Sequence, residues 1–211
     1  MRHHVGAPNW NGWNMAGRPT NRDERYIQVM KGFVRCVARY GLDGASLSHI
    51  AKEARLTRPL IRHHVGNRED MITGLTDFVL KSFDDQTAAM VSCLPNERPS
   101  SALVDLLFSE DAVSEPDMVL AFAALTARSL DDAKLRQRCR ETLLDFEAAI
   151  ADTLRRDHGD ADDAALGAAA HGIMALYFNL TSLAPLDMPK SWQNHARGLA
   201  HELLEKLDQP S

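Results

Sequence analysis

The sequence predicts an all-α protein of about nine helices, with a small N-terminal three-helix head on a larger helical body. Apolar residues recur at spacings of three and four in almost every segment after residue 21, which is the period of an amphipathic helix. No segment shows the alternation typical of a half-buried strand. The chain has 211 residues, 45% apolar and 25% charged, which suits one sizeable domain or two small ones.

The first helix is expected after a disordered arm at residues 1–20, a segment rich in Gly, Pro and Asn without apolar periodicity. Gly41 should end this helix. Its apolar stripe consists of Ile27, Met30, Val34 and Val37.

Two short helices follow, at 46–54 and 57–65. Ser46 and Thr57 are suitable N-caps, and Pro59 is tolerated because first-turn amides have no partner within a helix. Gly66 should end the second of the two. The inward face of the first is expected to be Leu47, Ile50, Ala51 and Ala54.

Asn67 should cap a long fourth helix. Its buried stripe would be Met71, Leu75, Phe78 and Val79. Five further helices are predicted at about 100–109, 116–129, 131–157, 162–183 and 189–207. The acidic segment 157–163 is interpreted as a turn that caps the helix after it, rather than as a calcium loop, because its Gly is misplaced for an EF-hand.

Several classes of protein are not supported. Cys36, Cys93 and Cys139 are odd in number and contain no CxxC, against a disulfide framework or zinc finger. We find no signal peptide, no long apolar run and no P-loop, GxSxG or other catalytic constellation. The sequence therefore predicts a cytoplasmic protein that is not an enzyme, with no catalytic residue, cofactor, metal or membrane partner.

Charge is distributed very unevenly. Residues 1–68 contain 12 Lys/Arg and 4 Asp/Glu, whereas residues 69–211 contain 12 and 25. This asymmetry favours a head that binds a polyanion on a body that repels one. A basic segment arising by chance is the alternative.

The helix pair at 46–65 has the spacing of a helix-turn-helix motif. On its second helix Ile61 and Val65 should pack inward, while the opposite face offers cationic groups to the DNA major groove. A solvated basic surface is the alternative. Candidate DNA-binding residues are Ser46, Thr57, Arg58, Leu60, Arg62, His63, His64 and Arg68.

Residues 21–72 resemble the N-terminal region of TetR-type transcriptional regulators. The resemblance runs from Gly41-Leu-Asp-Gly-Ala-Ser-Leu-Ser-His-Ile-Ala51, through Thr57-Arg-Pro-Leu-Ile-Arg-His-His-Val65, to Asn67-Arg-Glu-Asp-Met-Ile72. Arg55 stands where the family has a turn glycine, so either a non-glycine residue adopts positive φ there or the turn has another shape. The resemblance also implies a basic arm in the minor groove, here Arg18 and Arg22.

The resemblance further implies a homodimer formed by the last two helices and an effector pocket in the body, giving a head at 21–66 and a body at 67–211. Small residues on the eighth helix and an apolar stripe on the ninth agree with a dimer. Packing within one chain is the alternative for every residue of both sets. The interface candidates are Ala169, Ile173, Leu180, Trp192, Ala196, Leu199 and Leu203. The ligand candidates are Phe78, Phe108, Met118, Phe122, Phe146, His171, Met174, Tyr177 and Phe178.

The stretch 130–156 resembles choline-responsive repressors of the betaine pathway within this family. Our first hypothesis is a repressor that a small-molecule effector releases from a palindromic operator in double-stranded DNA. The alternative is a DNA-binding protein that is controlled by a protein partner, or unregulated, and has no small-molecule pocket.

Overall fold

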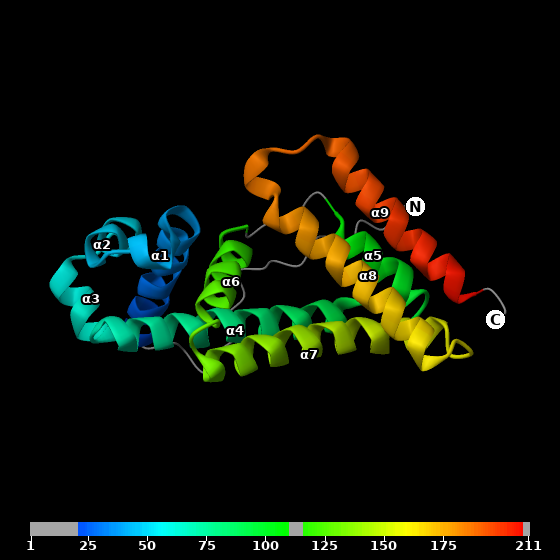
Figure 1. The fold of residues 1–211 in the computed structure, drawn as a ribbon, viewed down its shortest axis with the longest axis horizontal. Helices are drawn as coiled ribbons and strands as arrows, with labels where there is room; N and C mark the ends of the chain where they lie inside the picture. Colours follow the sequence, from blue (N-terminus) through cyan, green and yellow to red (C-terminus); the bar gives the residue numbers. More distant parts are fainter. Residues whose placement is uncertain (1–20, 110–115, 209–211) are drawn as a thin grey trace. The chain divides into compact units, whose positions relative to one another are not determined.

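The computed structural model describes residues 21–109 and 116–208, and Figure 1 shows their helices. Within these ranges there are nine α-helices, one 3-10 turn and no strand, so the all-α prediction is confirmed. The helices are α1 (Asn21–Gly44), α2 (Leu47–Ala54), α3 (Arg58–Val65), α4 (Arg68–Cys93), α5 (Pro99–Leu107), α6 (Pro116–Arg128), α7 (Ala133–Asp157), α8 (Asp163–Ser182) and α9 (Lys190–Leu207), with the 3-10 turn η1 (Ala184–Leu186) before α9.

The chain forms two compact units, and two helices contribute to both. Among the described residues, the head unit contains 21–83 and 117–141, and the body unit contains 84–109, 116 and 142–208. Helices α4 and α7 each begin in the head unit and end in the body unit. The linear boundary after residue 66 does not coincide with these units and stays a prediction. The predicted arm at 1–20 lies outside the described residues.

The head unit is built on close contact between α1 and α2. Helical geometry in α1 is interrupted at Gly41, where φ is 70° and ψ is 171°, as the sequence predicts. A Cβ on Gly32 would lie 2.8 Å from the Cβ and 2.9 Å from the backbone N of Ala54. Only a glycine lets the two backbones approach this closely.

Two of the three predicted caps in this unit form side-chain bonds. The Ser46 hydroxyl accepts from the His49 amide at 3.2 Å, and the Asn67 Oδ1 accepts from the Glu69 and Asp70 amides at 2.8 and 3.1 Å. The prediction for Thr57 is wrong in one respect, because it occupies the N-cap position of α3 without a side-chain hydrogen bond. Pro59 at the second helical position removes one of the two amides that an N-cap side chain binds.

The body unit has its own apolar core from α4, α5, α7, α8 and α9. Its fully buried side chains include Leu103, Ile150, Leu154, Leu166 and Ile173. Among the described residues, α8 alone is long and apolar enough to cross a membrane by length and composition. No long apolar run was expected from the sequence. The most apolar window of α8 is 39% buried, and the buried residues of its inward face belong to this core.

Candidate nucleic-acid interface

The turn between α2 and α3 keeps the left-handed conformation although no glycine is present. Arg55 has φ 54° and ψ 41°, and its amide donates to the Lys52 carbonyl at 3.2 Å. The Leu56 amide donates to the Ala51 carbonyl at 2.9 Å. The turn therefore does not take another shape, and Arg55 bears a conformational cost of roughly 1–2 kcal/mol.

Helix α3 has one buried and one exposed face, as its sequence predicts. The side chain of Ile61 is completely buried and Val65 is 7% exposed. Arg58, Pro59, Arg62 and His63 are exposed, whereas Leu60 is half-buried. The exposed face contains two guanidinium groups, and α3 contains no carboxylate, so this surface suits an anionic partner.

His64 is placed differently from its neighbour His63. It is half-buried and lines a cavity of about 300 Å³ together with Tyr26, Met30 and Asp70. The two imidazole rings meet edge to face with centroids 5.4 Å apart. His63 is therefore the histidine of α3 that remains on the outer face.

Arg68, predicted as a DNA-binding residue, also fastens the turn before α2. Its Nη1 donates to the Ala45 carbonyl at 2.6 Å and its Nη2 to the Leu42 carbonyl at 2.5 Å. The bonded residues lie 23 and 26 positions apart in the sequence, so no local pattern predicts these hydrogen bonds. These bonds tie the start of α4 to the helix-turn-helix and leave the remaining guanidinium donors for a partner.

Tyr40 and His49, which were absent from the predicted site, lie on the same part of the head. Their rings stack with centroids 4.6 Å apart, and the Arg39 guanidinium lies 5.7 Å from the Tyr40 ring centroid. Arg22 lies exposed in the first turn of α1, while Arg18 falls outside the described residues.

The ligand candidates do not form a single site. Phe78, Met118 and Phe122 belong to the head unit, and the others to the body unit. In the body unit Phe146, Tyr177 and Phe178 form an aromatic cluster, with ring centroids 5.9–6.0 Å apart. Burial raises the pKa of the Tyr177 hydroxyl.

The remaining body candidates differ widely in exposure. Phe108 and Met174 are buried in the core. The side chain of His171 is 66% exposed, with its Nδ1 3.5 Å from a carboxylate oxygen of Glu147.

The dimer-interface candidates also differ in exposure. Ala169, Ile173, Leu180 and Ala196 lie in the core of their own chain and are unavailable to a second copy. Trp192 and Leu199 are 39% and 48% exposed, and Leu203 is half-buried. The three available side chains lie along α9.

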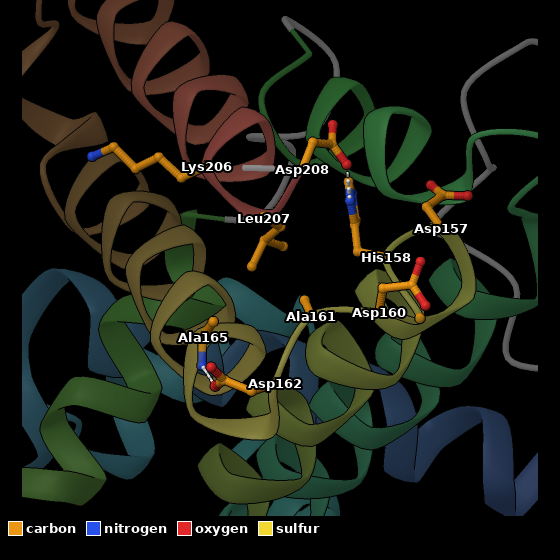
Figure 2. A pocket seen from close by; sticks show the side chains of 10 residues that line it. Asp157, His158, Asp160, Ala161, Asp162, Ala165, Lys206, Leu207 and Asp208 are labelled. Carbon is orange, nitrogen blue, oxygen red and sulfur yellow. Dashed lines mark hydrogen bonds and ion pairs between the residues drawn. The ribbon is translucent and has the colours of Figure 1, made fainter. Parts of the chain in front are cut away.

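The acidic turn between α7 and α8 lines a cavity of about 330 Å³ (Figure 2). The Asp162 carboxylate accepts from the Ala165 amide at 2.7 Å, which agrees with the interpretation as a helix cap. The His158 Nδ1 lies 2.7 Å from an Asp208 carboxylate oxygen, and Asp157 accepts from the Ser100 amide at 2.8 Å. Among the described residues no group of three or more His, Cys, Asp or Glu could hold a metal ion.

Similarity to known proteins extends over most of the chain. No protein-family model matches the sequence. The chain is 24% identical over 189 residues to the HTH-type transcriptional regulator BetI of Vibrio atlanticus, covering 87% of this chain and 92% of that protein. It is 25% identical over 114 residues to the regulator PksA of Bacillus subtilis and 33% identical over 52 residues to the repressor AcnR of Corynebacterium jeikeium. These two matches span 56% and 28% of the relatives.

Solved structures share the fold over nearly the whole chain. A TetR-family transcriptional regulator from Streptomyces coelicolor has a TM-score of 0.70 at 17% identity, covering 91% of this chain and 98% of that one. A transcriptional regulator from Saccharomonospora viridis, solved in complex with choline, has a TM-score of 0.67 at 18% identity, covering 86% and 96%.

The curated relatives are HTH-type transcriptional regulators, and the helix-turn-helix of the head unit supports the same class, a DNA-binding regulator, for this chain. Its fold is that of the TetR family, and the resemblance stated from residues 21–72 is confirmed. The relatives are regulators of transcription rather than enzymes.

Proposed function

We propose that the protein is a sequence-specific repressor whose α3 reads the major groove of an operator. The observation that carries this proposal is the division of α3 into a buried seam and an exposed face with Arg58, Arg62 and His63. Arginine forms bidentate hydrogen bonds with guanine O6 and N7, and the apolar seam holds the helix in a fixed orientation. The similarity to the repressor AcnR supports the sign of regulation.

A homodimer on a palindromic operator is the second part of the proposal. Two equivalent heads need a two-fold axis, and operator symmetry then mirrors the symmetry of the protein. Trp192 and Leu199 are exposed apolar side chains seven residues apart on α9, so they share one face of that helix. This face is the proposed contact with the second copy.

The third part is release of the DNA by a small-molecule effector. The cluster of Phe146, Tyr177 and Phe178 supplies aromatic faces that attract a cation or a planar apolar molecule. The choline complex of the Saccharomonospora viridis regulator supports a quaternary ammonium compound as the first probe. Effector and operator must favour different states of the protein for release to occur.

The proposal is tested by selecting sheared genomic DNA of the source organism with the purified protein at about 150 mM salt. We expect a recovered palindrome, and α3 variants should lose it. Fragments enriched no better than random DNA would contradict specific recognition. We expect the protein to act in the cytoplasm, where the DNA is.

Control by a protein partner, or no control, is the competing hypothesis. It is favoured by the dispersion of the ligand candidates over two units. Calorimetric titration with choline, with and without operator, separates the two. Weaker choline binding in the presence of operator supports an effector, and equal binding in both cases contradicts release by this compound.

A further inference from the structure

His49 is an exposed imidazole on α2 whose position is fixed by two contacts. Its ring stacks on Tyr40 with an interplanar angle of 27°, and its Nδ1 lies 2.9 Å from the Gly44 carbonyl oxygen. In the part of the chain that the structure describes, its Nε2 has no hydrogen-bond partner. The ring is therefore held in place with one nitrogen available.

The contact with Gly44 determines which nitrogen carries the proton of the neutral ring. A carbonyl oxygen can only accept, so Nδ1 donates in both charge states of the imidazole. Nε2 then has a lone pair in the neutral ring, which repels an anion. Protonation puts an N–H on Nε2 and a positive charge on the ring. His49 therefore donates a charge-assisted hydrogen bond to a phosphate only when it is protonated.

The charged groups around this turn come from three helices. The Glu53 carboxylate lies one turn further along α2 and is paired with Arg35 at 3.5 Å and Arg39 at 3.9 Å. Arg68 of α4 binds two carbonyls of the turn. Asp43 and Lys52 are exposed. Cations outnumber carboxylates here, which favours an anionic partner at this surface, and the negative charge of a bound phosphate would favour the protonated ring.

We propose that His49 is a further DNA-contacting residue, whose protonated ring binds a backbone phosphate so that DNA binding takes up a proton. The inference rests on the proposed DNA-binding function. Position supports a phosphate rather than a base, since the first helix of a helix-turn-helix crosses the DNA backbone. His49 also lies in the same turn of α2 as its cap, Ser46. Affinity for DNA should therefore be higher at pH 6 than at pH 8, because imidazole is the side chain whose charge can change in this range.

The test measures fluorescence anisotropy of a duplex of about 30 base pairs from the genomic selection, at pH 6.0 and 8.0 and fixed salt. We expect the full-length protein to bind about five- to tenfold more tightly at pH 6.0. His49→Gln is uncharged at both values and should lose most of this ratio. His49→Arg is charged at both and should bind tightly at both.

His171→Gln is the matched control, because it removes an exposed imidazole of the body unit that has no proposed part in DNA binding. This variant should keep the part of the pH 6.0 to pH 8.0 affinity ratio that is lost in His49→Gln. Salt dependence gives an independent readout that a purely structural role would not change. The slope of log K against log salt should be steeper by about 0.9 at pH 6.0 than at pH 8.0 in the wild type, but not in His49→Gln.

Affinity that is independent of pH, or a pH dependence that His49→Gln retains, would overturn the inference and leave the proposed function intact. If the selection recovers no sequence, the proposed function fails. The phosphate contact is then measured on a mixed-sequence duplex of the same length, where the same comparison of His49→Gln with wild type decides it. Thermal unfolding of each variant establishes that the folds are equivalent.

Discussion

The outer face of α3 and the aromatic cluster of the body unit were both predicted as binding surfaces, and they differ in what their side chains already contact. Arg58, Arg62 and His63 are exposed on a helix whose opposite face is buried. Phe146, Tyr177 and Phe178 pack against the body core and form ring contacts with one another. A periodic pattern in the sequence separates the two faces of one helix, but it cannot separate a core aromatic from a ligand contact. Substitutions that separate protein stability from DNA affinity can sharpen this contrast.

The largest effect on stability is expected for the buried seam of α3, which consists of Ile61 and Val65. Ile61→Ala should lower the free energy of unfolding by about 2–5 kcal/mol, because it leaves a cavity at a completely buried position. Ile173→Ala is the matched change in the body core, where the side chain is equally buried. Urea denaturation checks both. A loss below about 1 kcal/mol for Ile61→Ala would mean that α3 is not held by this seam.

Arg62→Ala should act on DNA affinity and leave stability unchanged. We expect operator binding to weaken by about 1–3 kcal/mol if the guanidinium reads a base, with relaxed specificity at one position. An equal loss on every sequence would assign Arg62 to a phosphate. Arg140→Ala removes an exposed charge of the same sign on α7 and should leave affinity nearly unchanged.

Arg68→Ala should affect both properties, because this side chain binds two backbone carbonyls of the head. The loss of both bonds is expected to cost about 1–3 kcal/mol of unfolding free energy. Arg68→Lys keeps the charge but cannot reproduce the fork of two donors, so it should recover only part of the loss. Unchanged stability in both variants would contradict the fastening role.

The smallest effect, and the one expected gain, belongs to the turn before α3. Arg55→Gly should stabilise the protein by up to about 1 kcal/mol, since relief of the left-handed strain exceeds the added entropy of the unfolded chain. Arg55→Ala keeps the strain and serves as the control. A melting temperature of Arg55→Gly below that of Arg55→Ala would show that the turn does not need positive φ.

The sequence predicted local features of the fold well. The predicted ends of the helices from α5 to α9 agree with the structure to within about two residues, and Ser46, Asn67 and Asp162 form the caps expected of them. These features depend on neighbouring residues, and so they can be read from a single sequence.

Contacts between distant residues were not predicted. The Arg68 bonds and the Tyr40–His49 stack join different helices and leave no periodic signal. For the same reason four of the seven interface candidates were found in the core of their own chain. Periodicity shows that a helix has an apolar face, but it does not show what covers that face.

The passage of α4 and α7 through both compact units has a consequence for anyone who edits the gene. The chain leaves the head unit after residue 83, returns at 117 and leaves again after 141. A fragment truncated at residue 66 or 83 would lack Phe122 and Leu125 of α6 and Leu135 of α7, which are buried and belong to the head unit. No single cut releases a complete head. A chimera that exchanges heads between two such regulators therefore has to transplant two separate stretches of coding sequence together.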